Sequence, residues 1–125
     1  MTDATAERFV SDQLEIEVKE DSESIDVIWT GKSIDRDPGK FITPILTGVL
    51  NRSVDRQKEV ILDFRKLRYM NSSTITPVIK VLERAKRGNV RVRVFYDSNR
   101  KWQDLSFSAL AIFQTRDGRV TVRGL

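Results

Sequence analysis

The stretch VILDFRKLRYMNSST, residues 60–74, decides the fold of this 125-residue chain. Its first five residues, Val60 to Phe64, are almost entirely apolar, which is typical of a central strand covered on both faces of a sheet. A polar, hydroxyl-rich segment follows, and apolar side chains then recur at helical spacing over residues 75–85. The stretch therefore predicts a buried strand that leads through a polar loop into an amphipathic helix.

The N-terminal part of the chain predicts a hairpin. Apolar and polar residues alternate over residues 14–18 and again over 25–29, and a period of two is typical of half-buried strands. The polar run between them predicts a turn at residues 20–23. Residues 1–12 show no such pattern, so we expect them to form a flexible N-terminal arm.

Helices and strands alternate through the rest of the chain. Asp37 and Pro38 predict a helix start, because Asp caps free amides and Pro fits the first helical position. Apolar residues then recur at helical spacing, although Pro44 and Gly48 predict a bent or shortened helix. We also expect a strand at 90–96, a helix at 102–113 and a strand at 120–122. The order ββαβαβαβ predicts an α/β domain over residues 13–125, with a mixed sheet, an N-terminal hairpin and helices packed on the sheet.

The composition excludes several kinds of chemistry. The chain has 22 Lys and Arg against 18 Asp and Glu, and it has neither His nor Cys. Cys/His zinc sites, Ser-His-Asp triads, Cys nucleophiles and disulfides are therefore excluded. We expect one domain and no enzyme, cofactor or metal site. The polar start and the lack of a run of about 20 apolar residues predict a cytoplasmic protein that does not bind membranes.

The charges are distributed unevenly along the chain. Residues 1–50 hold 11 acidic and 5 basic side chains, a balance of −6, whereas residues 51–125 hold 7 and 17, a balance of +10. A basic half attracts nucleic acid, an anionic lipid surface or an acidic protein face.

The hydroxyl-rich segment, residues 71–76, is open to two interpretations. Ser73 or Thr76 is a suitable N-cap, with Pro77 in the first helical turn, and hydroxyl residues are common at helix starts. One cap needs only one hydroxyl, however, and four lie together here. A phosphoryl group at this place would be stabilised by the free amides and the helix dipole, and would add about two negative charges.

Residues 60–73, with the helix, the Gly turn and the strand that follow, resemble the core of a STAS domain, a superfamily that includes the bacterial anti-sigma-factor antagonists. The resemblance covers roughly residues 55–113. The family signature is a strand ending in Asp, a short loop and then Asp-Ser-Ser-Gly at the start of a helix. Asp63 matches the strand-ending Asp and Ser72 the first Ser, while Ser73 matches the second, which is the usual phosphoacceptor. Asn71 and Thr74 replace the Asp and the Gly.

Within that superfamily, three segments are similar to the SiaC-like biofilm-regulating phosphoproteins. They are WTGKS at 29–33, the helix containing Phe41, and YMNSS at 69–73. In that group the phosphorylated hydroxyl directly follows the Asn, which here gives Ser72. The two alignments thus differ by one position; we favour Ser72 and keep Ser73 as the alternative. The unphosphorylated form of those proteins activates a diguanylate cyclase, and a kinase and a phosphatase set the balance.

The resemblance implies a non-enzymatic partner-switching protein. It would bind a diguanylate cyclase, an anti-sigma factor or a kinase while the serine is unphosphorylated, and release it after phosphorylation by a serine/threonine protein kinase. A PP2C-like phosphatase would reset it. The expected binding face is the loop at 67–74 with the exposed side of the next helix, and its candidate residues are Tyr69, Met70, Asn71, Thr74, Lys80, Glu83, Arg84 and Arg87.

Two other site hypotheses are weaker. Gly31-Lys32-Ser33 looks like part of a phosphate-binding loop, but that motif needs Gly at position 26, where the chain has Asp26, so we interpret it as a polar loop with a solvated Lys32. Asp63 and Asp97 each follow an apolar strand and have the chemistry to hold Mg²⁺ or accept a phosphoryl group, but the strand order fits a response regulator poorly.

The alternative function is a basic nucleic-acid-binding module. Binding of single strands needs aromatic platforms among exposed cations, and Tyr96 and Trp102 lie close to several cations in the sequence. Helical spacing instead predicts a core position for Trp102, so nucleic acid is not the partner we expect. The cations concerned are Arg84, Lys86, Arg87, Arg91, Arg93, Arg100 and Lys101.

Overall fold

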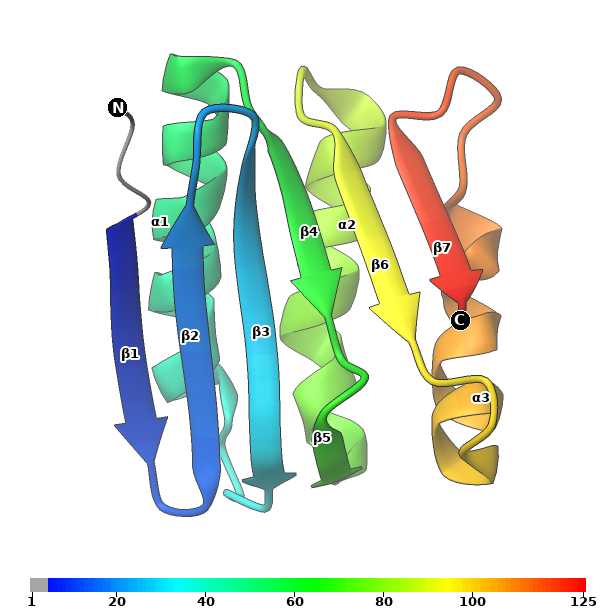
Figure 1. Ribbon diagram of the computed structural model, residues 1–125. Coiled ribbons are helices and arrows are strands. Elements are labelled where there is room, and N and C mark those ends of the chain that lie inside the picture. The colour runs from blue at the N-terminus through cyan, green and yellow to red at the C-terminus, as the bar shows by residue number, and fades with distance from the viewer. Residues whose placement is uncertain (1–4) are drawn as a thin grey trace.

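The computed structural model describes residues 5–125, which form a mixed sheet with helices packed on one face (Figure 1). The strand order is β1-β2-β3-β4-β6-β7, and β5 pairs with the end of β3. The first three strands are antiparallel neighbours, and all other pairings are parallel. The predicted α/β fold is therefore confirmed. The elements are β1 (Thr5–Ser11), β2 (Leu14–Glu20), β3 (Ser24–Ser33), α1 (Gly39–Arg56), β4 (Glu59–Asp63), β5 (Leu67–Met70), η1 (Ser72–Thr74), α2 (Ile75–Arg87), β6 (Val92–Tyr96), α3 (Lys101–Ser108), η2 (Ala109–Phe113) and β7 (Val120–Gly124).

The predicted N-terminal arm is wrong for Thr5–Ser11, which form the edge strand β1. This strand pairs with β2 along its whole length. Phe9 lies opposite Ile16 and packs against the core, and this single large apolar side chain anchors the strand. The sequence did not predict this strand because its other side chains are largely polar or exposed and give no alternating apolar pattern. The remaining part of the predicted arm, residues 1–4, lies outside the described residues.

The helix α1 differs from its prediction in how it begins and in its length. Pro38 occupies the N-cap position without a side-chain hydrogen bond, so Asp37 is not the cap that the sequence predicted. The helix continues for 18 residues through Pro44, which lies on its exposed side, so the predicted shortening is wrong. It ends at Gln57, whose φ of 54° is left-handed.

The hydrophobic core lies between the helices and one face of the sheet. Strand residues that point to the helices, such as Val27, Trp29 and Leu62, are fully buried. On β4, the alternate residues Ile61 and Asp63 point the other way and are only half-buried. The prediction that this strand is covered on both faces is therefore wrong: the helices of residues 5–125 all lie behind the sheet in Figure 1.

The short strand β5 was not predicted, because its four residues alternate too briefly to give a pattern. It pairs in parallel with the last residues of β3, with a register shift at Gly31 and Lys32. The predicted polar loop at Gly31-Lys32-Ser33 is thus the end of a strand. Gly31 has a φ of +89°, and a Cβ there would lie 2.0 Å from the carbonyl oxygen of Gln13, so only glycine fits.

Candidate functional site

One buried side chain, Gln103 on α3, holds the backbone between β4 and β5 in place. Its Nε2 donates hydrogen bonds to the carbonyl oxygens of Phe64 (2.7 Å) and Leu67 (2.8 Å). Its Oε1 accepts one from the backbone N–H of Asp97 at 2.7 Å. Gln103 was not predicted as a site residue, although it shares a helical face with the core residue Phe107, and a polar residue on such a face is a recognisable signal.

Four residues, Asn71 to Thr74, form what we call the serine loop, and a closed hydrogen-bond network holds it. The Asn71 side-chain oxygen accepts from the backbone N–H of Thr74 (3.1 Å) and from its hydroxyl (2.7 Å). The Asn71 Nδ2 donates to the carbonyl oxygen of Asp35 at 2.6 Å. The backbone N–H of Asn71 also donates to the carbonyl oxygen of Ser33 at 3.0 Å, which ties the loop to β3.

Ser33 completes this network from the end of β3. Its hydroxyl lies 2.7 Å from the hydroxyl of Thr74, and both side chains are buried. Since the Thr74 hydroxyl gives its one proton to Asn71, Ser33 must be the donor in this contact. Thr74 is fully buried, so its predicted contact with a partner protein is wrong: it supports the loop from inside.

Asn71 caps the 3-10 turn η1, and the N-cap position of α2 is Thr74, which makes no side-chain cap hydrogen bond, so neither Ser73 nor Thr76 is the cap that the sequence predicted. Ser72 and Ser73 are both exposed, and in the described part of the chain neither hydroxyl takes part in a side-chain hydrogen bond. They lie in η1, the 3-10 turn that runs into the 13-residue helix α2, and the first amides of a helical segment have no partners within it. The two hydroxyls are thus exposed at a helical N-terminus, outside the hydrogen-bond network of Asn71 and Thr74.

The other predicted partner contacts lie on two neighbouring surfaces. On β5, Tyr69 is 49% exposed, whereas Met70 is half-buried against the core and Asn71 is tied into the network. On α2, the predicted residues Lys80, Glu83, Arg84 and Arg87 are all exposed.

A groove runs between α1 and α2 beside these polar residues. Leu46, Leu50 and Val81 give it an apolar floor, and Lys80 and Arg84 contribute cations to its lining. The guanidinium of Arg84 also donates to the side-chain oxygen of Asn51 on α1 at 3.1 Å, which links the two helices across the groove. This α1–α2 groove therefore combines apolar contact with positive charge near the serine loop.

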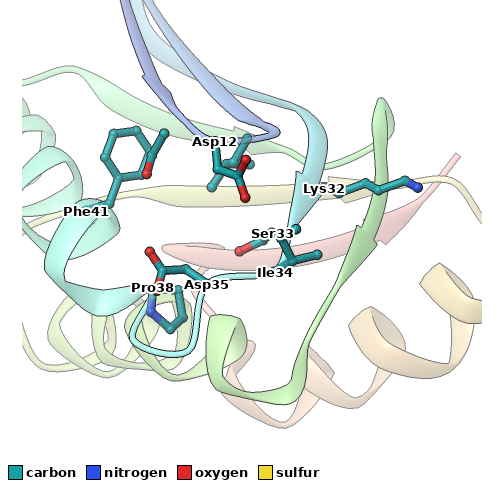
Figure 2. Close-up of a pocket in the computed structure, with 9 residues that line it drawn as sticks. Asp12, Lys32, Ser33, Ile34, Asp35, Pro38 and Phe41 are labelled. Carbon is teal, nitrogen blue, oxygen red and sulfur yellow. The ribbon is translucent and has the colours of Figure 1, made fainter.

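A small pocket lies between the β1–β2 turn, the end of β3 and the start of α1 (Figure 2). Ile34, which is 40% exposed, lines it together with Asp12 and Asp35. Figure 2 shows the ammonium group of Lys32 directed away from the two carboxylates. The backbone carbonyl of Asp35 accepts a hydrogen bond from the side chain of Asn71, and this bond links a residue of the pocket to the serine loop.

The strand-end carboxylates are engaged by arginines. Asp63 accepts from Arg65 through Nε (3.0 Å) and Nη2 (2.8 Å). Burial would raise the pKa of Asp63, but its hydrogen bonds with Arg65 and the charges of Arg65 and Lys66 outweigh burial and lower that pKa. Asp97 lies 3.4 Å from Arg100. Within residues 5–125, no group of three or more acidic side chains is placed to hold a metal ion.

The aromatic residues proposed as nucleic-acid platforms belong to the core. Tyr96 is 8% exposed and stacks on Phe107 with a centroid distance of 6.0 Å. Trp102 is half-buried and lies 6.1 Å from the same ring. Tyr96 therefore offers no stacking surface beside the cations of α2, β6 and α3, as the alternative function requires.

The same arrangement of strands and helices occurs in a protein of known structure. SiaC of Pseudomonas aeruginosa superposes with a TM-score of 0.57 and 19% sequence identity, covering 84% of this chain and 90% of that chain. The chain has the fold of SiaC. An uncharacterised protein of the DUF3478 family with a SpoIIAA-like fold, from Shewanella loihica PV-4, aligns with a TM-score of 0.44 and 13% identity over 98% of this chain and 87% of that one. No protein-family model and no curated protein sequence matches the chain.

The helices of the described residues include none of the length and apolar character that crossing a membrane requires.

Proposed function

We propose that this protein is a non-enzymatic, phosphorylation-controlled regulator that binds a partner protein while the serine loop is unmodified and releases it when Ser72 is phosphorylated. The observation that carries the proposal is the contrast within the loop. Asn71 and Thr74 are fully engaged in hydrogen bonds, whereas Ser72 and Ser73 present unengaged hydroxyls at the start of α2. A loop held this firmly offers its hydroxyls to a kinase without having to unfold.

The effect of phosphorylation would be local. A phosphoryl group adds about 1.5 to 2 negative charges at neutral pH, and free helix amides stabilise it where it forms. Because the hydrogen bonds of the loop run through Asn71 and Thr74, the added charge leaves the fold intact and acts on the partner directly. Repulsion and the cost of desolvating the phosphate then remove the partner from the surface.

The proposed binding face joins the serine loop to the α1–α2 groove. Tyr69 supplies an exposed aromatic ring, and Lys80, Arg84 and Arg87 supply cations, so the partner surface should be apolar with acidic residues at its margin. The fold of SiaC supports a partner of the kind that the sequence predicted: a diguanylate cyclase, an anti-sigma factor or a histidine-kinase-like protein, in the cytoplasm. A serine/threonine kinase and a PP2C-like phosphatase would set the phosphorylation state.

Phosphorylation of the wild-type protein by a cognate kinase with Mg-ATP, followed by peptide mass spectrometry, tests the site. We expect the phosphate on Ser72, with Ser73→Ala still modified and Ser72→Ala unmodified. Phosphate on Ser73 alone would move the site by one residue. If no kinase of the producing cell modifies either residue, the switch is wrong.

Partner capture tests the consequence. The unmodified chain and the Ser72→Ala variant should retain the same partner from a lysate, and Ser72→Asp should lose it. Ser22→Asp is a matched control, since Ser22 is exposed in the β2–β3 turn at the opposite end of the sheet and the same charge there should have no effect. Equal loss of partner in both Asp variants would show that only net charge matters and would overturn the proposed site.

A further inference from the structure

One face of the sheet carries no helix within residues 5–125, and we call it the open face (Figure 1). The strand register aligns its side chains in two rows that cross the sheet. From β2 through β3, β4 and β6 to β7, the first row is Glu17, Ile28, Asp63, Phe95 and Arg123, and the second is Lys19, Asp26, Ile61, Arg93 and Thr121.

The open face is apolar at its centre and divided in charge. Ile28, Ile61 and Phe95 are half-buried there, although no element of residues 5–125 covers them. Contiguous apolar side chains on an uncovered surface mark an interaction site. The acidic residues of the two rows lie on β2, β3 and β4, and the arginines lie on β6 and β7. Lys19 on β2 is the exception and lies 3.6 Å from Glu17, so the acidic side is represented mainly by Asp26 and Asp63.

We propose that the open face binds a second copy of this chain, in a dimer whose two-fold axis runs along the central strand β4. Rotation about this axis keeps each residue at the same position along the strand direction and exchanges the left and right halves of the sheet. Strand β3 therefore faces β6 of the second copy, and β2 faces β7 of the second copy. Asp26 then meets Arg93 of the second copy, which also pairs with Glu59 of its own chain at 3.2 Å, and Ile28 meets its Phe95. Every such contact occurs twice, because a two-fold interface uses the same patch on both copies.

The outer and axial positions of the two rows agree with this arrangement. Glu17 on β2 faces Arg123 of the second copy, and Arg123 has no acidic partner within the described part of its own chain. On the axis, Ile61 packs on Ile61 of the second copy. Asp63 likewise meets Asp63 of the second copy, but each of these carboxylates is already neutralised by a two-pronged contact with Arg65.

The geometry is that of two sheets packed face to face. Sheets that pack face to face lie about 10 Å apart, and side chains of alternating character interdigitate between them. The dimer leaves α2 and the serine loop uncovered, since the helices lie behind the sheet (Figure 1). Dimerisation and phosphorylation of Ser72 are measured by separate experiments, so each proposal can fail without the other.

Charge-reversal variants at the inner ion pair test the dimer. In sedimentation equilibrium of the full chain over a range of concentrations, Asp26→Arg and Arg93→Glu should each raise the dimer Kd about tenfold or more, because two like-charged pairs replace two attractive ones. Arg116→Glu, in the exposed loop before β7, is the matched control and should leave the Kd unchanged.

An equimolar mixture of the two reversal variants provides a second, stricter test. The mixture should recover the wild-type Kd as a heterodimer, because the Arg introduced at position 26 of one copy then meets the Glu introduced at position 93 of the other. The second pair of the heterodimer joins the unchanged Asp26 and Arg93. This recovery also shows that neither variant is weak merely through misfolding.

Three results would overturn the proposal. The first is a wild-type chain that sediments as a monomer up to its solubility limit, and the second is a dimer that survives both reversals. The third is a mixture that fails to associate when both variants give wild-type circular dichroism spectra. In the first of these cases the open face would be covered by a different protein, which cross-linking through Phe95→Cys in a lysate would then identify.

Discussion

The two ends of the sheet are held by different kinds of polar contact. At one end, uncharged groups hold the serine loop: the amides of Gln103 and Asn71 and the hydroxyls of Ser33 and Thr74. At the other end, three cations surround the buried carboxylate of Glu20.

The charged end joins β2 to the last turn of α1 and the start of β4. Glu20 is 6% exposed and lies 2.5 Å from Arg56, 2.8 Å from Lys58 and 3.8 Å from Arg52. Arg52 also pairs with Glu7 of β1 at 2.6 Å. These contacts depend on pH and salt, whereas a network of neutral groups is indifferent to both. The phosphorylation that we propose at Ser72 would thus add its charge to a loop that is held by uncharged groups.

The largest expected effect comes from the neutral end. Replacing Gln103 with Leu removes three hydrogen bonds and leaves the carbonyls of Phe64 and Leu67 and the N–H of Asp97 without the partner they have here. The free energy of unfolding should fall by about 3 kcal/mol, since each buried group left unsatisfied is costly. Urea denaturation measures this loss, and hydrogen exchange should quicken at Leu67. The control is Leu105→Ala on the same helix, where the side chain is 69% exposed and little change is expected. Equal losses of unfolding free energy in both variants would mean that the hydrogen bonds of Gln103 do not stabilise the fold.

A substitution at the charged end should lower the free energy of unfolding by less than Gln103→Leu does. Glu20→Gln keeps the shape but removes the charge shared by Arg56 and Lys58, and we expect unfolding to become easier by about 1–2 kcal/mol. Hydrogen exchange in the serine loop should stay at its wild-type rate, because the two ends are separate. Glu23→Gln, exposed in the β2–β3 turn, serves as the control. Faster exchange at Thr74 in the Glu20→Gln variant would show that the two ends are coupled.

Acid should abolish the difference in stability between the wild-type protein and the Glu20→Gln variant. The hydrogen bond from Lys58 lowers the pKa of Glu20, and Arg56 adds to this, while burial opposes it. A carboxylate whose folded pKa is depressed stabilises the fold above its unfolded pKa, and this contribution is lost as pH falls through the folded value. The wild-type advantage in urea midpoint should therefore be constant near neutrality and shrink steadily below the ordinary value of 4.5. An advantage that persists in strong acid would mean that packing, and not charge, explains it.

The sequence predicted the elements whose patterns are self-contained. Alternation indicated β2 and β3, and helical spacing indicated α2, because each repeats over enough residues to be recognised. The strand β5 escaped because its existence depends on pairing with β3, which is far away in the sequence. At the site, the resemblance indicated Ser72 and Ser73, whereas Gln103 and Ser33 act through contacts with distant backbone and hydroxyl groups that no local pattern records.

The smallest expected effect is the sharpest test of the site. If Ser72 and Ser73 have no structural task, replacing both with Ala should change the free energy of unfolding by less than about 0.5 kcal/mol, as at other exposed positions. Asn71→Ala is the matched change one residue away, and it should cost about 1 kcal/mol because it removes the cap from Thr74. Urea denaturation of the three proteins in parallel makes the comparison. A double serine variant as unstable as the Asn71→Ala variant would mean that the hydroxyls serve the helix start after all, and that they are not free for a kinase. The opposite outcome separates the two tasks of this loop, with Asn71 holding it in place and the serines available for modification.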